Sequence, residues 1–431
     1  MDNSEAFQKF VSEQEASLYR SVAAQIAAAA KEHGYISLIA YPALDSAIGA
    51  AIVASFLRRN RVDFEAAFSL TPPPKLDAPS VLIGYPTEAI GSIQSASKPS
   101  ALIGYGKIPR GITPLSIVAF EETSAAALAV AVLSELAIVG DISTYSVVSS
   151  LWLRLDRGKR GELEGVPRAV VEMLKIENKV EEVFSIRLFR WNTLPTEEAL
   201  SITLDPYLPG ITGSSEAALK FLREDPRLAV LEGKVLSEAQ EQAMAVLGEK
   251  LYNLIKKASR LPRKPTEVVG MAYYSTRPVE ADLRETSYMF SAYAHVAGID
   301  RLLGLSLDER GVYAAAHYMY RMSFETIIDD VEKLLDACRT GRLKRTTLAG
   351  VRSLEIDAGF PPIAARVLSQ LGCMESGDLP LFVDEEGGTV AIAESVQKIF
   401  DYKELSKLQE QGCLEYIDGS MYVKIRRDRC G

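Results

Sequence analysis

The segment YISLIAYPALDSAIGAAIVASFLRRNRVDFEAAF, from Tyr35 to Phe68, decides the fold of this chain. Its beginning, Tyr35 to Tyr41, is a continuous apolar run of the kind found in strands that are buried on both faces of a parallel sheet. The small residues that follow allow a helix to lie close to that sheet. VDFEAAFSL, which the break at Pro72-Pro73-Pro74 ends, predicts the next strand, so the sequence indicates alternating strands and helices.

Two later segments look like copies of one another. SVLIGYP (Ser80–Pro86) and SALIGYG (Ser100–Gly106) both contain Ile-Gly-Tyr, and PLSIVAF (Pro114–Phe120) adds a further strand. Together these strands predict an α/β fold with a doubly wound, mostly parallel sheet. In such sheets, sites form at the carboxyl ends of the strands.

Beyond the first sheet, the sequence indicates a second lobe. The residues from Ser237 to Arg260 form one long amphipathic pattern, which Pro262 and Pro265 end, and we expect this helix to connect the lobes. The expected organisation is an α/β domain over residues 1–230, a helical connector over 231–265, and a smaller α/β lobe with a helical insertion over 266–431.

Charge and cysteine content narrow the class of protein. The chain has 48 Lys and Arg against 57 Asp and Glu, a net charge of -9, which argues against binding nucleic acid over the whole surface but allows a local basic groove. None of the four cysteines is spaced as Cys-x-x-Cys. We therefore expect neither a zinc knuckle nor a disulfide framework, and a reduced, intracellular protein.

No membrane or export segment is expected. The N-terminus is polar and acidic where a signal peptide would be basic and then apolar. The longest apolar run, Ala125 to Gly140, is shorter than the ~20 residues of a bilayer span and contains Glu135. It predicts a core helix in a cytoplasmic protein.

The strand ends carry little that could support catalysis. They present Tyr41, Tyr85 and Tyr105, and tyrosine beside glycine or proline supplies neither ligands for a divalent metal nor a matched acid–base pair near neutral pH. No Gly-x-Gly-x-x-Gly follows the first strand, and the sequence contains no Walker A loop.

In their order, these segments resemble the motifs of the DHH phosphoesterase superfamily, which includes the RecJ exonucleases. Members typically have a strand, then His-x-Asp-x-Asp-Gly, then an Ala-rich helix. In the matching stretch of this chain, Tyr41 stands at the His position and Ala43 at the first Asp position. Asp45 matches the second Asp, and Ser46 replaces the Gly.

The later motifs resemble the family in the same incomplete way. Tyr85 stands where the second motif has a metal-binding Asp, and Tyr105, Gly106 and Lys107 stand where the family has Asp-His-His. In AIVGDISTYS, Asp141 fits the acidic residue of the fourth motif. The tail is similar to a DHH-associated domain but lacks its Gly-Gly-Gly-His.

The resemblance therefore implies an inactivated member of the family, most similar to the catalytically inactive archaeal RecJ-like proteins. The family chemistry needs two metal ions about 4 Å apart, and two carboxylates, Asp45 and Asp141, cannot cage two hard cations. We expect no catalytic residue, no metal and no cofactor. The alternative is residual metal-dependent exonuclease or phosphodiesterase activity of the RecJ type on single strands.

Each remaining site residue also has a structural interpretation. Asp45 and Asp141 could be N-caps of the helices that follow them. The three tyrosines could fill the space of the lost ligands, or could stack on a nucleic-acid base.

The candidate nucleic-acid contacts are basic. Lys107 and Arg110 follow one of the strand ends, and Arg342, Lys344 and Arg345 belong to the densest basic cluster of the chain. The same cluster could instead be a helix C-terminus with favourable charge.

The resemblance also implies partners. Inactivated archaeal RecJ-like proteins are regarded as counterparts of the eukaryotic replication factor called cell-division-cycle protein forty-five. This implies a subunit that joins the GINS complex and the MCM helicase in the replicative helicase assembly, with single-stranded DNA left open as a further ligand.

Overall fold

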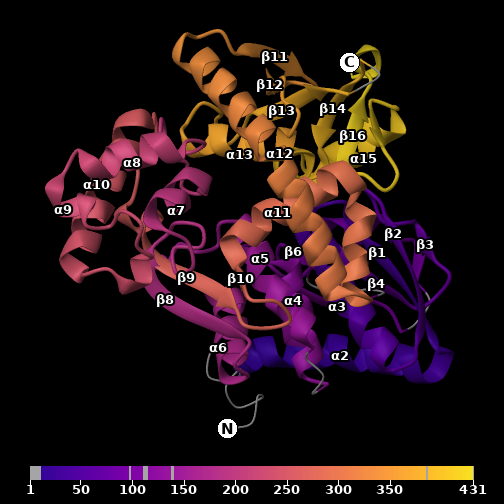
Figure 1. The fold of residues 1–431 in the computed structure, drawn as a ribbon. Coiled ribbons are helices and arrows are strands. Elements are labelled where there is room, and N and C mark those ends of the chain that lie inside the picture. Colours follow the sequence, from indigo (N-terminus) through magenta and orange to yellow (C-terminus); the bar gives the residue numbers. More distant parts are fainter. Residues whose placement is uncertain (1–10, 97–98, 110–114, 137–139, 385–386, 431) are drawn as a thin grey trace.

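The N-terminal domain is built on a five-stranded parallel sheet in the order β2-β1-β4-β6-β7 (Figure 1). The computed structural model describes residues 11–96, 99–109, 115–136, 140–384 and 387–430. The strands of this sheet are β1 (Tyr35–Ala40), β2 (Asp63–Phe68), β4 (Ser80–Pro86), β6 (Ala101–Tyr105) and β7 (Ser116–Phe120). The predicted parallel α/β sheet is confirmed, and it brings the carboxyl ends of β1, β4 and β6 side by side.

Successive residues of these strands face opposite layers, because side chains alternate along a strand. In β1, Leu38 packs with the helices of one layer, and Ile39 packs on the other side of the sheet. The helical layer consists of α2 (Glu13–His33), α3 (Leu44–Arg59), α4 (Ala125–Ser134) and α5 (Tyr145–Trp152). The other face is covered by η1 (Thr87–Ser92), by the short strands β3 (Lys75–Leu76) and β5 (Ser95–Ala96), and by the C-terminal lobe.

The first part of the longest apolar run forms the core helix α4 (Ala125–Ser134), as predicted. Every residue of α4 from Ala125 to Leu133 is buried, and Ser124 caps its first turn through Ala127. Among the residues that the structure describes, no helix is both long enough and apolar enough to cross a bilayer.

A second sheet has the strand order β10-β9-β8. Between β8 and β9 in the sequence, the chain forms a helical subdomain with its own core. After α6 (Gly165–Ile176), the chain forms β8 (Val180–Ile186) and returns as the antiparallel strand β9 (Val269–Ser275), followed by β10 (Ala281–Asp282). The helices in between are α7 (Thr196–Ile202), α8 (Ser215–Arg223), α9 (Pro226–Ala229) and α10 (Glu241–Ala258).

This topology corrects the expected connector over residues 231–265. Because β9 returns to pair with β8, the chain comes back to the second sheet after the long helix α10, whose apolar face packs into the core of the helical subdomain. Directly after α10, the backbone N–H of Arg260 donates to the carbonyl of Leu371 in the C-terminal lobe at 2.9 Å. The helix that leads into the C-terminal lobe is α12 (Glu309–Arg339), which follows α11 (Leu283–Ala297) and η5 (Ile299–Ser306).

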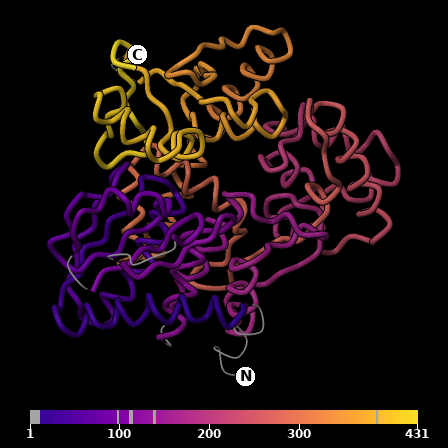
Figure 2. Tube along the Cα trace, turned by 180° about the vertical axis from the view of Figure 1, so that it is seen from behind, coloured from indigo at the N-terminus to yellow at the C-terminus, as the bar shows by residue number. Residues whose placement is uncertain are grey.

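The C-terminal lobe confirms the predicted second α/β unit. Its six-stranded sheet has the order β11-β12-β13-β14-β16-β15, and the view from behind places this lobe against the N-terminal domain, with the helical subdomain to one side (Figure 2). The strands are β11 (Lys344–Leu348), β12 (Val351–Glu355), β13 (Leu379–Val383), β14 (Thr389–Ile392), β15 (Leu414–Tyr416) and β16 (Tyr422–Ile425). The helices are α13 (Pro361–Gln370), α14 (Ala393–Ile399) and α15 (Tyr402–Glu410).

The expectation of reduced cysteines is wrong for this structure, because all four are paired. Cys338, at the end of α12, is bonded to Cys373 after α13, and Cys413 is bonded to Cys430. The partners lie 35 and 17 residues apart in sequence. Since only the tertiary fold brings them together, no local spacing could have indicated these bonds.

We predict that the Cys338–Cys373 bond stabilises the C-terminal lobe. Replacing both cysteines by serine should lower the free energy of unfolding by about 2–4 kcal/mol, because the bond restricts the unfolded chain. Urea unfolding under oxidising conditions measures this. Dithiothreitol should destabilise the original chain at least as much as this double substitution does, and equal stability with and without reductant would contradict the prediction.

Candidate functional site

Two tyrosines fill the carboxyl ends of the central strands. Tyr41 and Tyr85, which follow or end β1 and β4, are fully buried, and their rings meet edge to face with centroids 5.9 Å apart. The Tyr41 hydroxyl donates to the carbonyl of Ala393 in the C-terminal lobe at 2.9 Å, and the Tyr85 hydroxyl donates to the carbonyl of Ser69 at 2.7 Å. Burial raises the pKa of both phenols, so they are neutral hydrogen-bond donors at any physiological pH.

Of the two acidic motif residues, the structure places Asp45 at these strand ends. The sequence predicts that Asp45 caps α3, in which it lies, but Asp45 caps α4 instead. The N-cap of α3 is Ala43, which makes no side-chain cap bond. The Asp45 carboxylate instead reaches the start of α4, where it accepts from the Ser124 hydroxyl at 2.5 Å and from the backbone N–H groups of Ala125 and Ala126 at 2.6 and 3.2 Å. The fourth donor is the hydroxyl of Tyr105.

These four donors occupy the whole acceptor capacity of the Asp45 carboxylate. A carboxylate has about four lone-pair positions, two on each oxygen. One oxygen accepts from Ser124 and Ala126, and the other from Tyr105 and Ala125. Burial raises the pKa of Asp45, and the four hydrogen bonds oppose that shift.

The glycine of each Ile-Gly-Tyr copy makes this close packing possible. Gly84 has a φ of +77°, and a Cβ atom there would lie 1.8 Å from the Ser46 hydroxyl. A Cβ on Gly104 would lie 2.1 Å from the carbonyl oxygen of Tyr85. The repeat therefore marks positions where neighbouring elements approach too closely for any side chain.

Asp141 is not brought to this site. It begins η2 (Asp141–Thr144) and lines a surface pocket together with Ser55 and Arg59, at the opposite end of α3 from Asp45. With a rise of 1.5 Å per residue, the two ends of α3 lie about 20 Å apart. The N-cap of η2 is Gly140, so the expected capping role of Asp141 is also corrected; its carboxylate lies 3.6 Å from the Lys179 ammonium.

The C-terminal lobe closes over the strand ends. The Gln397 amide donates to the carbonyl of Gly84 at 2.8 Å, and the hydroxyls of Tyr402 and Ser92 are 2.9 Å apart. With the bond from Tyr41 to Ala393, these contacts tie α14 and α15 to the first domain. No local pattern indicates these contacts, because they join residues more than 300 positions apart.

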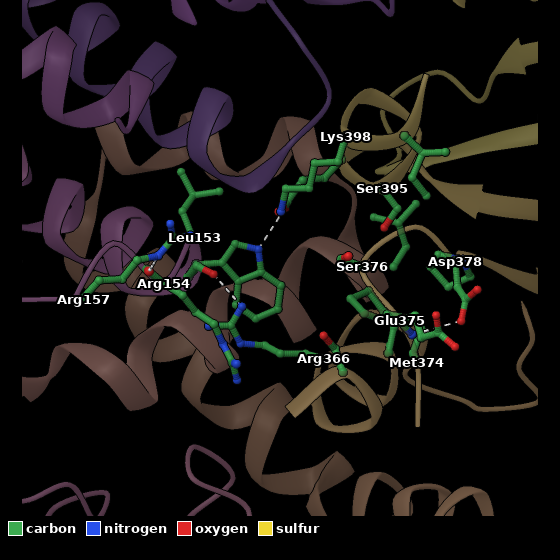
Figure 3. A pocket seen from close by; sticks show the side chains of 18 residues that line it. Leu153, Arg154, Arg157, Arg366, Met374, Glu375, Ser376, Asp378, Ser395 and Lys398 are labelled. Carbon is green, nitrogen blue, oxygen red and sulfur yellow. Dashed lines mark hydrogen bonds and ion pairs between the residues drawn. The ribbon is translucent and has the colours of Figure 1, made fainter. Parts of the chain in front are cut away.

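A cavity of about 410 Å³ lies beside this contact, between the end of α5 and the C-terminal lobe (Figure 3). The Trp152 indole donates to Glu394 at 2.9 Å, and the Arg366 guanidinium stacks over the Trp152 ring at 4.3 Å. Burial would raise the pKa of Glu394, but Lys398, Trp152 and Arg366 outweigh it and hold that pKa below its usual range. Sequence reasoning missed these cavity residues, which carry no motif.

The candidate nucleic-acid contacts lie on different domains. Lys107 follows β6, where its ammonium lies 3.4 Å from Glu121 and its backbone carbonyl accepts from Thr87; its neighbour Gly106 has a φ of +99°. Arg342 and Lys344 lie at the edge strand β11, where Arg342 forms an ion pair with Asp336.

Arg345 belongs to β11 in the C-terminal lobe, on a different domain from Lys107. Arg345 lies 3.3 Å from Asp378 and also donates to the carbonyl of Cys373. Arg110 lies outside the described residues. These local partners indicate that part of the positive charge of the cluster is neutralised within the chain.

The residues at the strand ends do not fit a divalent metal centre. Within the described ranges, no group of three or more His, Cys, Asp or Glu side chains is placed to hold a metal ion. The neighbours of Asp45 are hydroxyls and backbone amides, and divalent metals need several carboxylate or imidazole ligands at once. These residues therefore support no reaction step through a metal.

We predict that Asp45 is a structural residue. Asp45→Asn should lower the free energy of unfolding by about 2–4 kcal/mol. The asparagine side chain replaces one carboxylate oxygen with an NH₂ group, so the buried donors that faced this oxygen lose their acceptor. Asp141→Asn, at a partly exposed position, should change the free energy of unfolding by less than about 1 kcal/mol. Denaturant unfolding of both variants measures this difference, and equal stabilities would contradict it.

Comparison with solved structures shows which known fold this chain shares. No family model and no curated protein sequence matches this chain. Among solved structures, CDC45 from Entamoeba histolytica is similar with a TM-score of 0.59 and 10% identity over 96% of each chain. RecJ from Thermus thermophilus in complex with Mn2+ gives a TM-score of 0.41 and 11% identity, over 95% of this chain and 52% of RecJ. At such identity a likeness concerns the fold alone, and the chain has a CDC45-like α/β fold.

Proposed function

We propose that this protein is a non-catalytic subunit of a replicative helicase assembly, in which it bridges the GINS complex and the MCM helicase. The observation that carries the proposal is the closed end of the parallel sheet. Where a DHH phosphoesterase would hold its metals, this chain has two fully buried tyrosines and one carboxylate with four hydrogen-bond donors.

Closure by the C-terminal lobe supports a binding role over a catalytic one. A hydrolase needs a position near its strand ends where substrate and water can meet the catalytic groups. In this chain the Tyr41 hydroxyl and the Gln397 amide bond across that position to the opposite lobe. The core of the sheet is retained, which is what a scaffold for protein partners would require.

The fold likeness to CDC45 supports the same proposal, because it covers 96% of both chains and so includes both lobes. The net charge of -9 favours protein partners over a tight complex with duplex DNA. Single-stranded DNA remains part of the proposal as a secondary ligand of the basic residues.

We predict a complex with both partners. Recombinant GINS and MCM from the source organism, mixed with this chain at physiological salt, should elute together from a sizing column, and each pairwise affinity should be in the micromolar range or tighter, about -8 kcal/mol. Light scattering on the peak gives the stoichiometry. If neither GINS nor MCM binds, the proposal fails.

We also predict that the chain lacks nuclease activity. With Mn²⁺ and a labelled single-stranded oligonucleotide, the protein should release no more nucleotide than a buffer blank, because its strand-end residues cannot hold a metal pair. Any activity found is compared in Asp45→Asn and Asp141→Asn. Cleavage that disappears only in Asp45→Asn, with the fold retained, would establish the alternative of residual exonuclease chemistry. Equal cleavage in both variants would indicate a contaminant.

A further inference from the structure

A cluster of arginines lies where the N-terminal domain meets the helical subdomain, away from the strand ends. We call it the arginine pocket and define it by Arg154, Arg157, Arg187, Arg263 and Arg284, which line one cavity of about 270 Å³. They come from the segment after α5, the residue that follows β8, the segment before β9, and the first turn of α11. Residues distant in sequence thus converge on one space.

Two aspartates lie among these arginines. Asp156 is well paired, since the same oxygen lies 2.8 Å from Arg187 and 2.6 Å from Arg284. Asp205 is loosely paired, with Arg154 at 3.7 Å and with Arg284 and Arg366 at 3.5 Å each. Distances of this length are ion pairs without a good hydrogen bond, and one Asp205 oxygen is buried with no hydrogen-bond partner in the structure.

The pocket has more positive charge than its carboxylates balance. Six cationic side chains line it, against three acidic ones, and Arg157 has a further partner outside the lining, Glu122 at 3.3 Å. The side chains of Arg187 and Arg284 are only 5% and 9% exposed. Buried charge without a full set of partners is costly, so a structural ion network would be expected to pair its charges more evenly.

Several arginine donors in this pocket also lack an acceptor. The Nε atoms of Arg187 and Arg263 and the Nη2 atom of Arg154 are buried without a hydrogen bond. Burial, and then the neighbouring charge of Arg284, lower the pKa of Arg187 to about 10. These unused N–H donors are the groups that a bound oxyanion would satisfy.

The space is suited to a small oxyanion. At ~30 Å³ per water molecule, a cavity of this size accommodates a phosphate group together with ordered water. Arg154 and Arg157 also line the cavity between the lobes, where both are labelled in Figure 3, so the two spaces share a wall. A ligand could therefore extend from the pocket toward the lobe contact.

We propose that the arginine pocket binds a phosphate group. Guanidinium forks match the spacing of phosphate oxygens and can donate two parallel hydrogen bonds. The source of the phosphate is either a small molecule, such as inorganic phosphate or a nucleoside monophosphate, or the terminal phosphate of a nucleic-acid strand. This site is separate from the strand ends and does not depend on the proposed role in the helicase assembly.

Titration of the full-length chain with inorganic phosphate, followed by calorimetry at constant ionic strength in chloride, tests this. We expect saturable binding of one phosphate per chain and at least tenfold weaker binding in Arg154→Gln. Arg154 is suited to substitution, because its side chain is 36% exposed. The matched control is Arg223→Gln, which removes an exposed arginine paired with Glu232 in the helical subdomain and should bind phosphate as the original chain does.

Two further arms identify the source of the phosphate. A nucleoside monophosphate that displaces inorganic phosphate, while a 5′-phosphorylated oligonucleotide does not, would assign a small-molecule ligand. Displacement by the 5′-phosphorylated oligonucleotide but not by its 5′-hydroxyl counterpart would assign a strand end. The proposal is overturned if phosphate produces no saturable heat beyond chloride, or if folded Arg154→Gln binds phosphate as tightly as Arg223→Gln.

Discussion

The fold depends on one buried carboxylate. Asp45 lies in the first turn of α3 and accepts hydrogen bonds from the start of α4 and from Tyr105 at the end of β6. It therefore fixes the relative positions of two core helices and a strand of the parallel sheet. Because a helix N-terminus carries partial positive charge, an acidic group there is favourable in itself. The same bonds leave the carboxylate no free position toward a metal.

The tyrosines extend this constraint to the C-terminal lobe. Tyr41 fills the end of β1 and bonds to Ala393, and Gln397 on the same helix bonds to Gly84 at the end of β4. The carboxyl ends of the central strands thus form an apolar contact between the lobes, with a few directed hydrogen bonds. Such a contact holds the two lobes against one another, as the proposed binding role requires.

Much of the first domain could be predicted because its signals are local. Strands such as Tyr35–Ala40 are continuous apolar runs, and burial on both faces of a sheet requires that pattern. The connector, the capping partner of Asp45 and the position of Asp141 depend on which elements pack together. Two long amphipathic helices, α10 and α12, give the same kind of sequence pattern, and only β8 pairing with β9 decides which one joins the lobes.

Manganese soaked into crystals of this protein tests the central claim most directly, through an anomalous difference map recorded at the manganese absorption edge. The account predicts no manganese beside Asp45, and a Tyr41 hydroxyl still bonded to the Ala393 carbonyl. Two anomalous peaks about 4 Å apart next to the Asp45 carboxylate, with Tyr41 displaced, would contradict it.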